Sequence, residues 1–407
     1  MPIIVQKFGG TSVADAHRVH LAARRAVRAK LAGKQVVLVV SAMGDTTDRL
    51  VELAGQVSRR PAKRELDVLV STGEQVSMAL MAMAIHEAGY EAVSVTGAQI
   101  GLLTDGVHTE ARIRSIDTAR IRKMLDRGKI VIVAGFQGVD EHLNITTLGR
   151  GGSDTTAVAL AAALRAEMCE IYTDVDGVYT ADPHRVPTAR RIEAISYEEM
   201  LELAGLGAQV MHPRSIEIGK KYEVKIHVRS SFTDTPGTLI MNEVPDMEEM
   251  AVSGATLKPD VGRITFIGLP NRPGIVAEIF GQIAGRRVMV DDIIQNVTHQ
   301  GQMVSVSFTV DGKDVGAAQA VAESLAQRFT NVAVEFDFQL SRLSIVGLGM
   351  RTHSGVAARM FKALADQNIN IENVSTSEIV ISVLVRRDDG ERALNAVHQA
   401  FELDKPA

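Results

Sequence analysis

Two glycine-containing segments place a cationic side chain among backbone turns that can bind an anion. The first is Lys7–Ser12, with the sequence Lys-Phe-Gly-Gly-Thr-Ser, and the second is Thr147–Thr156, in which three glycines surround Arg150. Glycine lets the backbone turn sharply and bring N–H groups close to a ligand, and the helix expected after each segment adds a positive dipole end. The lysine and the guanidinium supply full charges for phosphate or carboxylate. The first segment therefore suits a polyphosphate, and the second suits a carboxylate or a phosphate.

Both segments also have a structural interpretation. Lys7 precedes its glycines and the chain has no G-x-x-x-x-G-K-[ST] motif, so the first segment is not a Walker A loop and alone fits a turn with a solvated lysine. Ser153 and Asp154 fit the N-cap region of a helix. Helix capping does not explain an arginine among glycines, and we therefore favour a ligand for Arg150.

Three further segments carry polar side chains near strand ends or helix starts. Ser41–Thr47 offers hydroxyls, Ser71–Glu74 opens a helix, and Thr173–Tyr179 offers carboxylates, a turn glycine and an aromatic ring. Glu74 either binds a cation such as a substrate ammonium group or complements the helix dipole. The third segment suits a nucleoside or its Mg²⁺, or is a plain Asp-Gly turn. Anion loops and carboxylates without a nucleophile–base pair predict phosphoryl transfer, which depends on positioning and charge neutralisation.

The elements that would position these segments alternate along the first 240 residues. Uninterrupted apolar runs such as Val36–Val40 predict strands that are covered on both faces. We expect an α/β fold with a mostly parallel sheet between two helix layers, and ligands at the carboxyl ends of its strands. Strands are predicted at 3–6, 36–41, 92–96, 130–135, 170–173 and 225–229, and helices at 14–30, 72–88, 113–126, 155–166 and 197–204.

Composition limits the class of protein. A length of 407 residues predicts two or three domains, and 46% hydrophobic with 23% charged residues argues against disorder. A net charge of −5 disfavours nucleic-acid binding. Cys169 is the only cysteine, which excludes an intrachain disulfide and a thiolate zinc site, and the eleven histidines lack metal-ligand spacing. Without a leader or an apolar run of roughly 20 residues, we expect a cytoplasmic protein with no membrane partner.

The C-terminal part contains an internal repeat after a polar, acidic segment at 242–249 that is typical of a linker. Each copy predicts strand–helix–strand–strand–helix, the ferredoxin-like order, and fits either duplicated packing or a ligand-binding module. The later strands are expected at 304–310 and 379–385, and the last helices at 317–328 and 391–401. The matching pairs are Arg263–Gly268 with Arg342–Gly347, Gly274–Phe280 with Gly355–Phe361, and Val288–Ile293 with Ile369–Val374.

Five motifs together resemble the aspartate kinase family: Lys7–Val13, Ser71–Glu74, Thr147–Asp154, Tyr172–Tyr179 and Val228–Ser231. The resemblance covers essentially the whole chain. It implies an amino-acid kinase fold at 1–245, a first ACT module at 262–340, and a second at 341–407 with a strand from 250–261. The implied reaction transfers a phosphoryl group from MgATP to L-aspartate and gives 4-phospho-L-aspartate, the entry to lysine, threonine and methionine biosynthesis.

The resemblance also implies the residues of the site. Lys7 and Asp154 would be catalytic, with Lys7 on the β- and γ-phosphates and Asp154 orienting it. Glu74 would receive the α-ammonium group of aspartate, and Arg150 with Ser153 its α-carboxylate. No metal site made by the protein alone is expected. ATP would contact Lys7, Phe8, Gly9, Gly10, Ser41, Thr173, Asp174, Tyr179, Asp182, His184, Arg185 and Gln209, and aspartate Thr47, Glu74, Arg150, Gly151, Gly152 and Ser153.

Three positions depart from the family pattern. Many members have arginine where His184 stands, lysine where Gln209 stands, and aspartate where Asn271 stands. His184 or its neighbour Arg185 would approach the phosphates, and the role of Gln209 would be weaker or taken by another cation.

For the repeat, the resemblance implies an effector site for lysine, threonine or both. The residues implied are Asn271, Arg272, Pro273, Gly274, Ile275, Asp291, Gln295 and Asn296. The second copy lacks the proline, having Ser354 before Gly355, and would serve mainly for dimerisation. A homo-oligomer through the ACT modules is expected, and an internal start at Met247 or Met250 would give a shorter subunit.

Two other classes of function remain open. The same fold serves other amino-acid, carbamate and nucleoside monophosphate kinases, although Glu74 and Arg150 favour an α-amino acid over UMP. An amino-acid sensor with an inactive kinase domain is the other alternative, against which the intact set of Lys7, Glu74, Arg150 and Asp154 argues.

Overall fold

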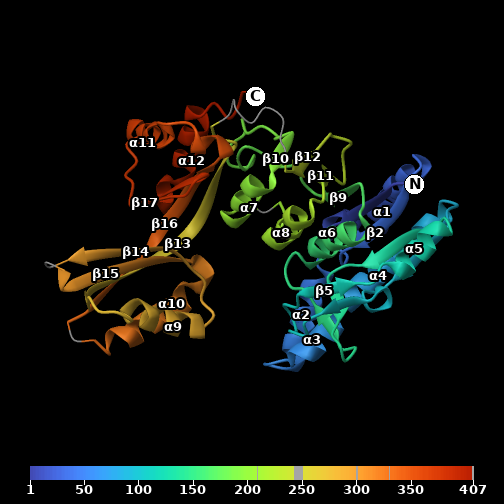
Figure 1. Ribbon diagram of the computed structural model, residues 1–407, viewed down its shortest axis with the longest axis horizontal. Coiled ribbons are helices and arrows are strands. Elements are labelled where there is room, and N and C mark those ends of the chain that lie inside the picture. The colour runs from blue at the N-terminus through green and yellow to red at the C-terminus, as the bar shows by residue number, and fades with distance from the viewer. Residues whose placement is uncertain (209, 243–250, 299–300, 330, 406–407) are drawn as a thin grey trace. The chain divides into compact units, whose positions relative to one another are not determined.

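The computed structural model describes residues 1–208, 210–242, 251–298, 301–329 and 331–405. The chain forms two compact units, each of which takes two stretches of the sequence (Figure 1). The first unit comprises Met1–Tyr179 and Arg191–Met247, and the second comprises Thr180–Arg190 and Glu248–Ala407. The predicted residues Gln209, Met247 and Met250, and residues 243–249 of the predicted linker, lie outside the described residues.

The first unit is built on an eight-stranded sheet in the order β10-β12-β11-β9-β1-β2-β6-β3. All neighbouring strands are parallel except β11 and β12, which confirms the predicted α/β fold with a mostly parallel sheet. The strands are β1 (Ile3–Phe8), β2 (Gln35–Val40), β3 (Ala92–Val95), β6 (Ile130–Ala134), β9 (Met168–Thr173), β10 (Ala194–Ser196), β11 (Ile226–Ser230) and β12 (Thr238–Met241).

Helices cover both faces of this sheet. On one face, α1 (Ala16–Leu31) and α4 (Thr72–Glu87) form a core with the side chains of Phe8, Leu38 and Ile132. On the other face α6 (Gly152–Leu164) contacts β1, β2 and β9. Because successive side chains of a strand point to opposite faces, strands buried on both sides need apolar residues at every position. The first unit also contains α7 (Tyr197–Gly205) and α8 (Pro213–Tyr222).

A second sheet in this unit is smaller, with four short strands in the order β5-β4-β7-β8. The predicted helix at 113–126 is wrong in its first part, because Ile113–Ile116 is strand β5, antiparallel to β4 (Leu102–Thr104). The helix of this segment, α5, spans only Ala119–Asp126. Here pairing with a neighbouring strand outweighs the local helical pattern. The other two strands, β7 (Gln137–Val139) and β8 (Ile145–Thr147), form a hairpin.

Two helices precede α4 that the sequence patterns did not predict, namely α2 (Thr46–Val57) and α3 (Lys63–Val70). Within the described ranges, the stretch Lys63–Glu87 is the one helical segment with the length and hydropathy to cross a membrane. Half of its most apolar window is buried in the fold, and Met81 and Ile85 lie fully inside the core. A buried core helix has this character as well as a membrane span does.

The second unit contains one six-stranded sheet in the order β14-β15-β13-β16-β18-β17, with antiparallel pairs throughout. Its elements follow the predicted strand–helix–strand–strand–helix order twice. They are β13 (Gly254–Pro270), α9 (Ile275–Gly285), β14 (Val290–Thr298), β15 (Met303–Asp311), α10 (Val315–Ala326), β16 (Ala333–Val346), α11 (Val356–Asp366), β17 (Asn373–Thr376), β18 (Val380–Arg386) and α12 (Gly390–Ala400).

The two long strands serve both copies of the repeat. Residues 254–258 of β13 pair with residues 342–346 of β16 beside the second copy, and residues 261–270 of β13 pair with β15 of the first. The predicted boundary between the two ACT modules, at 340/341, therefore falls in the middle of β16.

A short stretch of the predicted kinase range packs in the second unit. Within Thr180–Arg190, the Thr180 carbonyl accepts a 2.7 Å hydrogen bond from the Ala255 N–H, and Ala181 and Val186 are buried in the same core as Met360. Burial of these apolar side chains attaches the stretch to the second unit, and local sequence pattern does not reveal such long-range packing.

Candidate active site

The carboxyl ends of four parallel strands lie in register at one edge of the large sheet. Phe8 of β1 pairs with Val40 of β2 and with Tyr172 of β9, and Val40 pairs with Ala134 of β6. The glycine, hydroxyl and carboxylate segments that follow these strands therefore begin at the same edge. Parallel sheets of this kind bind ligands at that edge.

Lys7 and Asp154 meet at this edge as an ion pair. The Lys7 ammonium lies 2.7 Å from Asp154 Oδ1, and both side chains are largely buried. Lys7 is the second-to-last residue of β1. Asp154 lies in the first turn of α6, where the helix dipole also favours a negative charge. The structure thus brings together the two residues predicted to be catalytic.

Gly9 and Gly10 leave space that larger residues would fill. A Cβ atom on Gly9 would lie 3.4 Å from the Lys7 ammonium, so glycine keeps that cation open to a ligand. A Cβ atom on Gly10 would lie 3.0 Å from the carbonyl oxygen of Ala42, and the Gly44 N–H donates to the Gly10 carbonyl at 3.0 Å. The loops after β1 and β2 therefore pack directly on each other.

Glu74 is a buried carboxylate in the first turn of α4, only 3% exposed. Its Oε1 accepts a 3.1 Å hydrogen bond from the Ala42 N–H, whereas the buried Oε2 has no hydrogen-bond partner among the described residues. Burial raises the pKa of Glu74 to about 7, against the smaller effect of the backbone hydrogen bonds. A buried carboxylate with one unpaired oxygen is an environment that favours a cationic ligand.

Arg150 is exposed and stands between two glycines in left-handed backbone conformation, Gly149 with φ 77° and Gly151 with φ 64°. A Cβ atom on Gly151 would lie 2.2 Å from the Cβ of His212, so no larger residue fits there. Ser153 packs against the end of β6, where a Cβ on Gly135 would come within 2.7 Å of its hydroxyl. The backbone of the loop is therefore closely packed, and its guanidinium is exposed.

Arg214 holds this loop from α8, and the sequence analysis did not identify it. Its guanidinium donates to the carbonyl of Leu148 at 2.8 Å and to that of Ala111 at 2.6 Å. The preceding His212 caps α8 by accepting the Arg214 N–H at its Nδ1. Burial lowers the pKa of His212, so the ring is neutral at pH 7, as an accepting Nδ1 requires.

Phe136 adds a strained residue at the same place. It has a φ of 69°, which is costly for a bulky side chain, and its backbone groups bond to Thr156 Oγ1 and to the Leu148 N–H. Such strain persists only when the surrounding contacts impose it, and it is concentrated at functional sites.

The residues predicted to bind the nucleotide divide between the two units. Thr173 is the last residue of β9 and its hydroxyl donates to Asp174 at 3.2 Å, and Tyr179 forms an isolated antiparallel β-bridge with Arg191. Asp182, His184 and Arg185 belong to the second unit, where Arg185 forms ion pairs with Asp182 and Glu391. In the first unit Ser41 and Thr47 are half-buried beside the loop that follows β2.

The residues predicted to bind an effector lie around the start of α9 and along β14. Gly274 is left-handed with φ 92° at the N-terminus of α9, and the Asn271 side chain donates to the Gly301 carbonyl at 2.7 Å. Gln295 and Asn296 are exposed on β14.

Asp291 is already ion-paired within the second unit. Its partner is Arg342, whose guanidinium also lies 2.7 Å from Asp292 Oδ2. Although burial favours the protonated acid, Arg342 holds the pKa of Asp291 below its ordinary value. An effector amine would therefore share Asp291 with this guanidinium.

Two known protein families match parts of this chain. Residues 2–230 match the amino acid kinase family, and residues 343–401 match an ACT domain. An aspartokinase from Geobacillus stearothermophilus is 52% identical, and an aspartate kinase from Pseudomonas putida 50% identical, each over 100% of this chain and 99% of its own.

A solved structure shares the fold. The crystal structure of E. coli aspartokinase III in complex with aspartate and ADP matches with a TM-score of 0.81 at 27% identity, over 98% of this chain and 99% of its own. With at least half of its residues identical to those of these relatives from end to end, the chain is a phosphotransferase that belongs to the aspartate kinase family.

Proposed function

We propose that this chain transfers the γ-phosphoryl group of ATP to the β-carboxylate of L-aspartate and forms 4-phospho-L-aspartate. The proposal is carried by two side chains on segments next to the carboxyl ends of β2 and β6. Glu74 is buried, and its Oε2 has no hydrogen-bond partner among the described residues; the guanidinium of Arg150 is exposed. A carboxylate and a guanidinium recognise the ammonium and carboxylate groups of an α-amino acid and leave its side chain free to react. UMP carries neither group.

The transfer needs no general base. The β-carboxylate is ionised at pH 7, so one of its oxygens attacks the γ-phosphorus directly. The new O–P bond forms as the bond to the β,γ-bridging oxygen breaks, and ADP leaves with that electron pair. The obstacle is repulsion between two anions, which the buried ammonium of Lys7 and the N–H groups near Gly9 and Gly10 reduce. Asp154 holds the Lys7 ammonium at the sheet edge.

The residues present fit Mg²⁺ bound together with the nucleotide. Mg²⁺ is usually held by one or two carboxylates and by substrate phosphates, without a cage made only of protein groups. Asp154 beside Lys7, and Asp174 at the end of β9, are carboxylates at the edge where the phosphates would lie. When bound, the ion neutralises charge on the phosphates.

We further propose that this reaction is the first step of lysine, threonine and methionine biosynthesis in the cytoplasm, and that lysine, threonine or both inhibit it through the ACT region. The glycine turn at Gly274 and the exposed face of β14 support an amino-acid site in the first copy of the repeat. A relative, E. coli aspartokinase III, has been crystallised in complex with lysine and aspartate. Assembly into a homo-oligomer through the ACT modules, with or without a shorter subunit, belongs to the same proposal.

The test is a turnover assay with the full chain. ADP release is measured with L-aspartate and Mg²⁺, and the acyl phosphate is trapped as its hydroxamate. L-glutamate and UMP replace aspartate as controls, and the aspartate assay is repeated with lysine and threonine. ADP release with L-aspartate, and not with L-glutamate or UMP as the acceptor, supports the proposal. Turnover only with another acceptor identifies a different kinase of the fold, and folded protein without turnover that binds lysine or threonine identifies a sensor.

A further inference from the structure

Helix α3 connects the two halves of the proposed aspartate site. It ends at Val70, directly before the Ser71–Glu74 segment that carries Glu74. It also contacts β8, which ends at Thr147, just before the glycine loop of Arg150. The position of α3 against β8 therefore affects the separation of Glu74 and Arg150.

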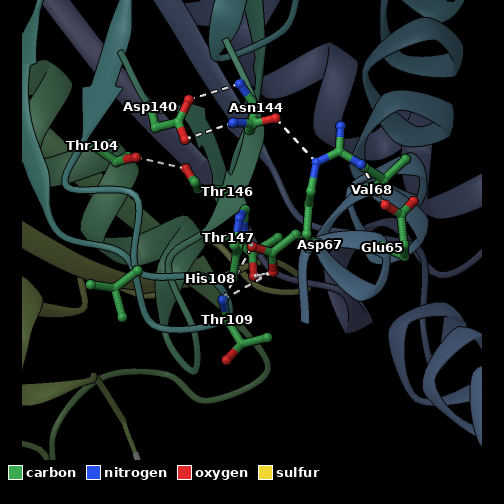
Figure 2. Close-up of polar contacts among 12 residues, drawn as sticks. Glu65, Asp67, Val68, Thr104, His108, Thr109, Asp140, Asn144, Thr146 and Thr147 are labelled. Carbon is green, nitrogen blue, oxygen red and sulfur yellow. Dashed lines mark hydrogen bonds and ion pairs between the residues drawn. The ribbon is translucent and has the colours of Figure 1, made fainter. Parts of the chain in front are cut away.

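Asp67 joins α3 to β8 through a side-chain hydrogen bond (Figure 2). Its side chain is fully buried, and its Oδ1 accepts a 2.6 Å hydrogen bond from the Thr147 hydroxyl. Its Oδ2 lies 2.7 Å from His108 Nδ1, and the Thr109 N–H donates to both oxygens at 3.1 Å. Because a buried carboxylate is costly unless its oxygens are bonded, these donors hold α3 in one place.

Two further side-chain hydrogen bonds join the β7–β8 hairpin to α3 and to the residue that follows it. Where α3 meets α4, the Gln137 side chain of β7 donates to the Ser71 carbonyl at 2.8 Å. At the other end of α3, Arg64 Nε donates to Asn144 Oδ1 at 3.1 Å, and Asn144 is itself held by Asp140 (Figure 2). The β7–β8 hairpin is thus hydrogen-bonded to α3 and to the residue that follows it at three places. Of these three connections, the one made by Asp67 is the one that involves a fully buried carboxylate.

We propose that Asp67 is a positioning residue that fixes the distance between Glu74 and Arg150 through its bond to Thr147, and so selects the acceptor amino acid. This inference rests on the proposed function, because it takes Glu74 and Arg150 as the groups that bind the acceptor. Asp67 touches no reacting atom in this account. A shift of α3 changes acceptor binding, whereas the nucleotide segments after β1 and β9 lie on other elements and keep their geometry.

Thr147→Val tests the contact with a nearly isosteric change that removes one donor to Asp67. We expect the KM for aspartate to rise about tenfold, the factor for losing one buried hydrogen bond to a charged group. The KM for ATP should stay within about twofold, and the preference for L-aspartate over L-glutamate should narrow. Thr147→Ser restores the hydroxyl and should return the KM for aspartate close to the wild-type value.

Thr146→Val is the matched control. Thr146 is the neighbouring residue on β8, is equally buried, and its hydroxyl lies 2.8 Å from that of Thr104, away from α3. The same substitution there removes a buried hydrogen bond without loosening Asp67, and the KM for aspartate should stay within about twofold. Asp67→Glu is the second variant, because it keeps the charge but displaces the carboxylate, and it should raise the KM for aspartate selectively.

The outcomes separate the inference from the proposed function. Equal effects of Thr147→Val and Thr146→Val on the KM for aspartate, or a parallel rise in the KM for ATP, would overturn the positioning role. If Thr147→Val does not fold, an unchanged KM for aspartate in Asp67→Glu would overturn it instead. Wild-type protein that fails to use aspartate would contradict the proposed function before any variant is compared.

Discussion

The Lys7 ammonium lies 2.7 Å from the Asp154 carboxylate, which links the end of β1 to the first turn of α6. The carboxylate orients a cation that would otherwise extend into solvent, and the space above Gly9 leaves that cation open to a second anion. The Lys7 ammonium is therefore positioned before a phosphate binds. Such preorganisation makes electrostatic stabilisation effective.

Lys7→Ala should lower kcat by about a hundredfold or more, because it removes a charge that acts mainly on the transferring group. The KM for aspartate should change little. The measurement is steady-state kinetics with both substrates varied. Lys34→Ala is the control, since Lys34 pairs with Glu167 away from the sheet edge and its loss should leave kcat unchanged. An unaffected kcat in Lys7→Ala would contradict the role given to this lysine.

The pH profile of aspartate use should follow Glu74. Burial raises the pKa of Glu74 to about 7, so the carboxylate is protonated in much of the free enzyme below that pH. A neutral Glu74 cannot pair with the substrate ammonium group, and kcat/KM for aspartate should fall as the pH drops from 8 to 6. The profile of kcat/KM for ATP at saturating aspartate should be flatter. A level aspartate profile across this range would exclude Glu74 as the ammonium site.

Glu74→Gln should abolish efficient aspartate use and yet stabilise the ligand-free protein at alkaline pH. The folded pKa of Glu74 lies above its unfolded value of 4.5, so the cost of burying the charge appears as pH rises from 4.5 to about 7. The stability gained by the substitution should grow by about 2 kcal/mol between pH 5.5 and pH 8. Thermal unfolding without aspartate at both pH values measures this. A gain that is equal at the two pH values would contradict the burial of an ionised Glu74.

Gly151→Ala should disrupt the loop of Arg150. A Cβ atom there would lie 2.2 Å from His212 Cβ, and overpacking of this kind costs about 1–3 kcal/mol. Gly89→Ala is the matched control, because Gly89 is also left-handed with φ 84° but has nothing within 4 Å of the added carbon. Both variants share the backbone cost, and only Gly151→Ala should also raise the KM for aspartate. Equal kinetics in the two would show that the His212 contact is unimportant.

The repeat should carry the feedback control. Asp291→Asn weakens both the pair with Arg342 and the proposed site for an effector amine, so inhibition by lysine or threonine should require at least about tenfold more effector. Uninhibited kcat should be unchanged. Glu323→Gln, on an exposed face of α10, should keep normal inhibition. Unaltered inhibition in Asp291→Asn would place the effector amine elsewhere.

The sequence patterns predicted the large sheet well because its strands are buried on both faces. Val36–Val40 and Ile130–Ala134 are uninterrupted apolar runs, and such runs leave little choice of structure. The loop predicted after Val36–Val40 therefore lies at the carboxyl edge of the sheet, whereas the glycine loop of Arg150 follows β8 of the small sheet. The small sheet was missed because strands such as Leu102–Thr104 have too few residues to show a period.

Side chains that act through other side chains were harder to predict. Asp67 lies between Leu66 and Val68 in α3, but its partners Thr147 and His108 are distant in the sequence. Arg214 likewise reaches Leu148 from another helix. Such contacts follow from the packing of elements and have no local spacing of their own.

The placement of Thr180–Arg190 in the second unit means that the backbone passes between the units three times, after Tyr179, after Arg190 and after Met247. A single protease cut near Met247 would therefore leave residues 180–190 of the second unit on the N-terminal fragment, so neither fragment would be one complete unit alone. A gene fragment that starts after the last passage would encode the rest of the second unit without the side chains of Ala181 and Val186, and the apolar surface that they cover in the intact chain would be exposed.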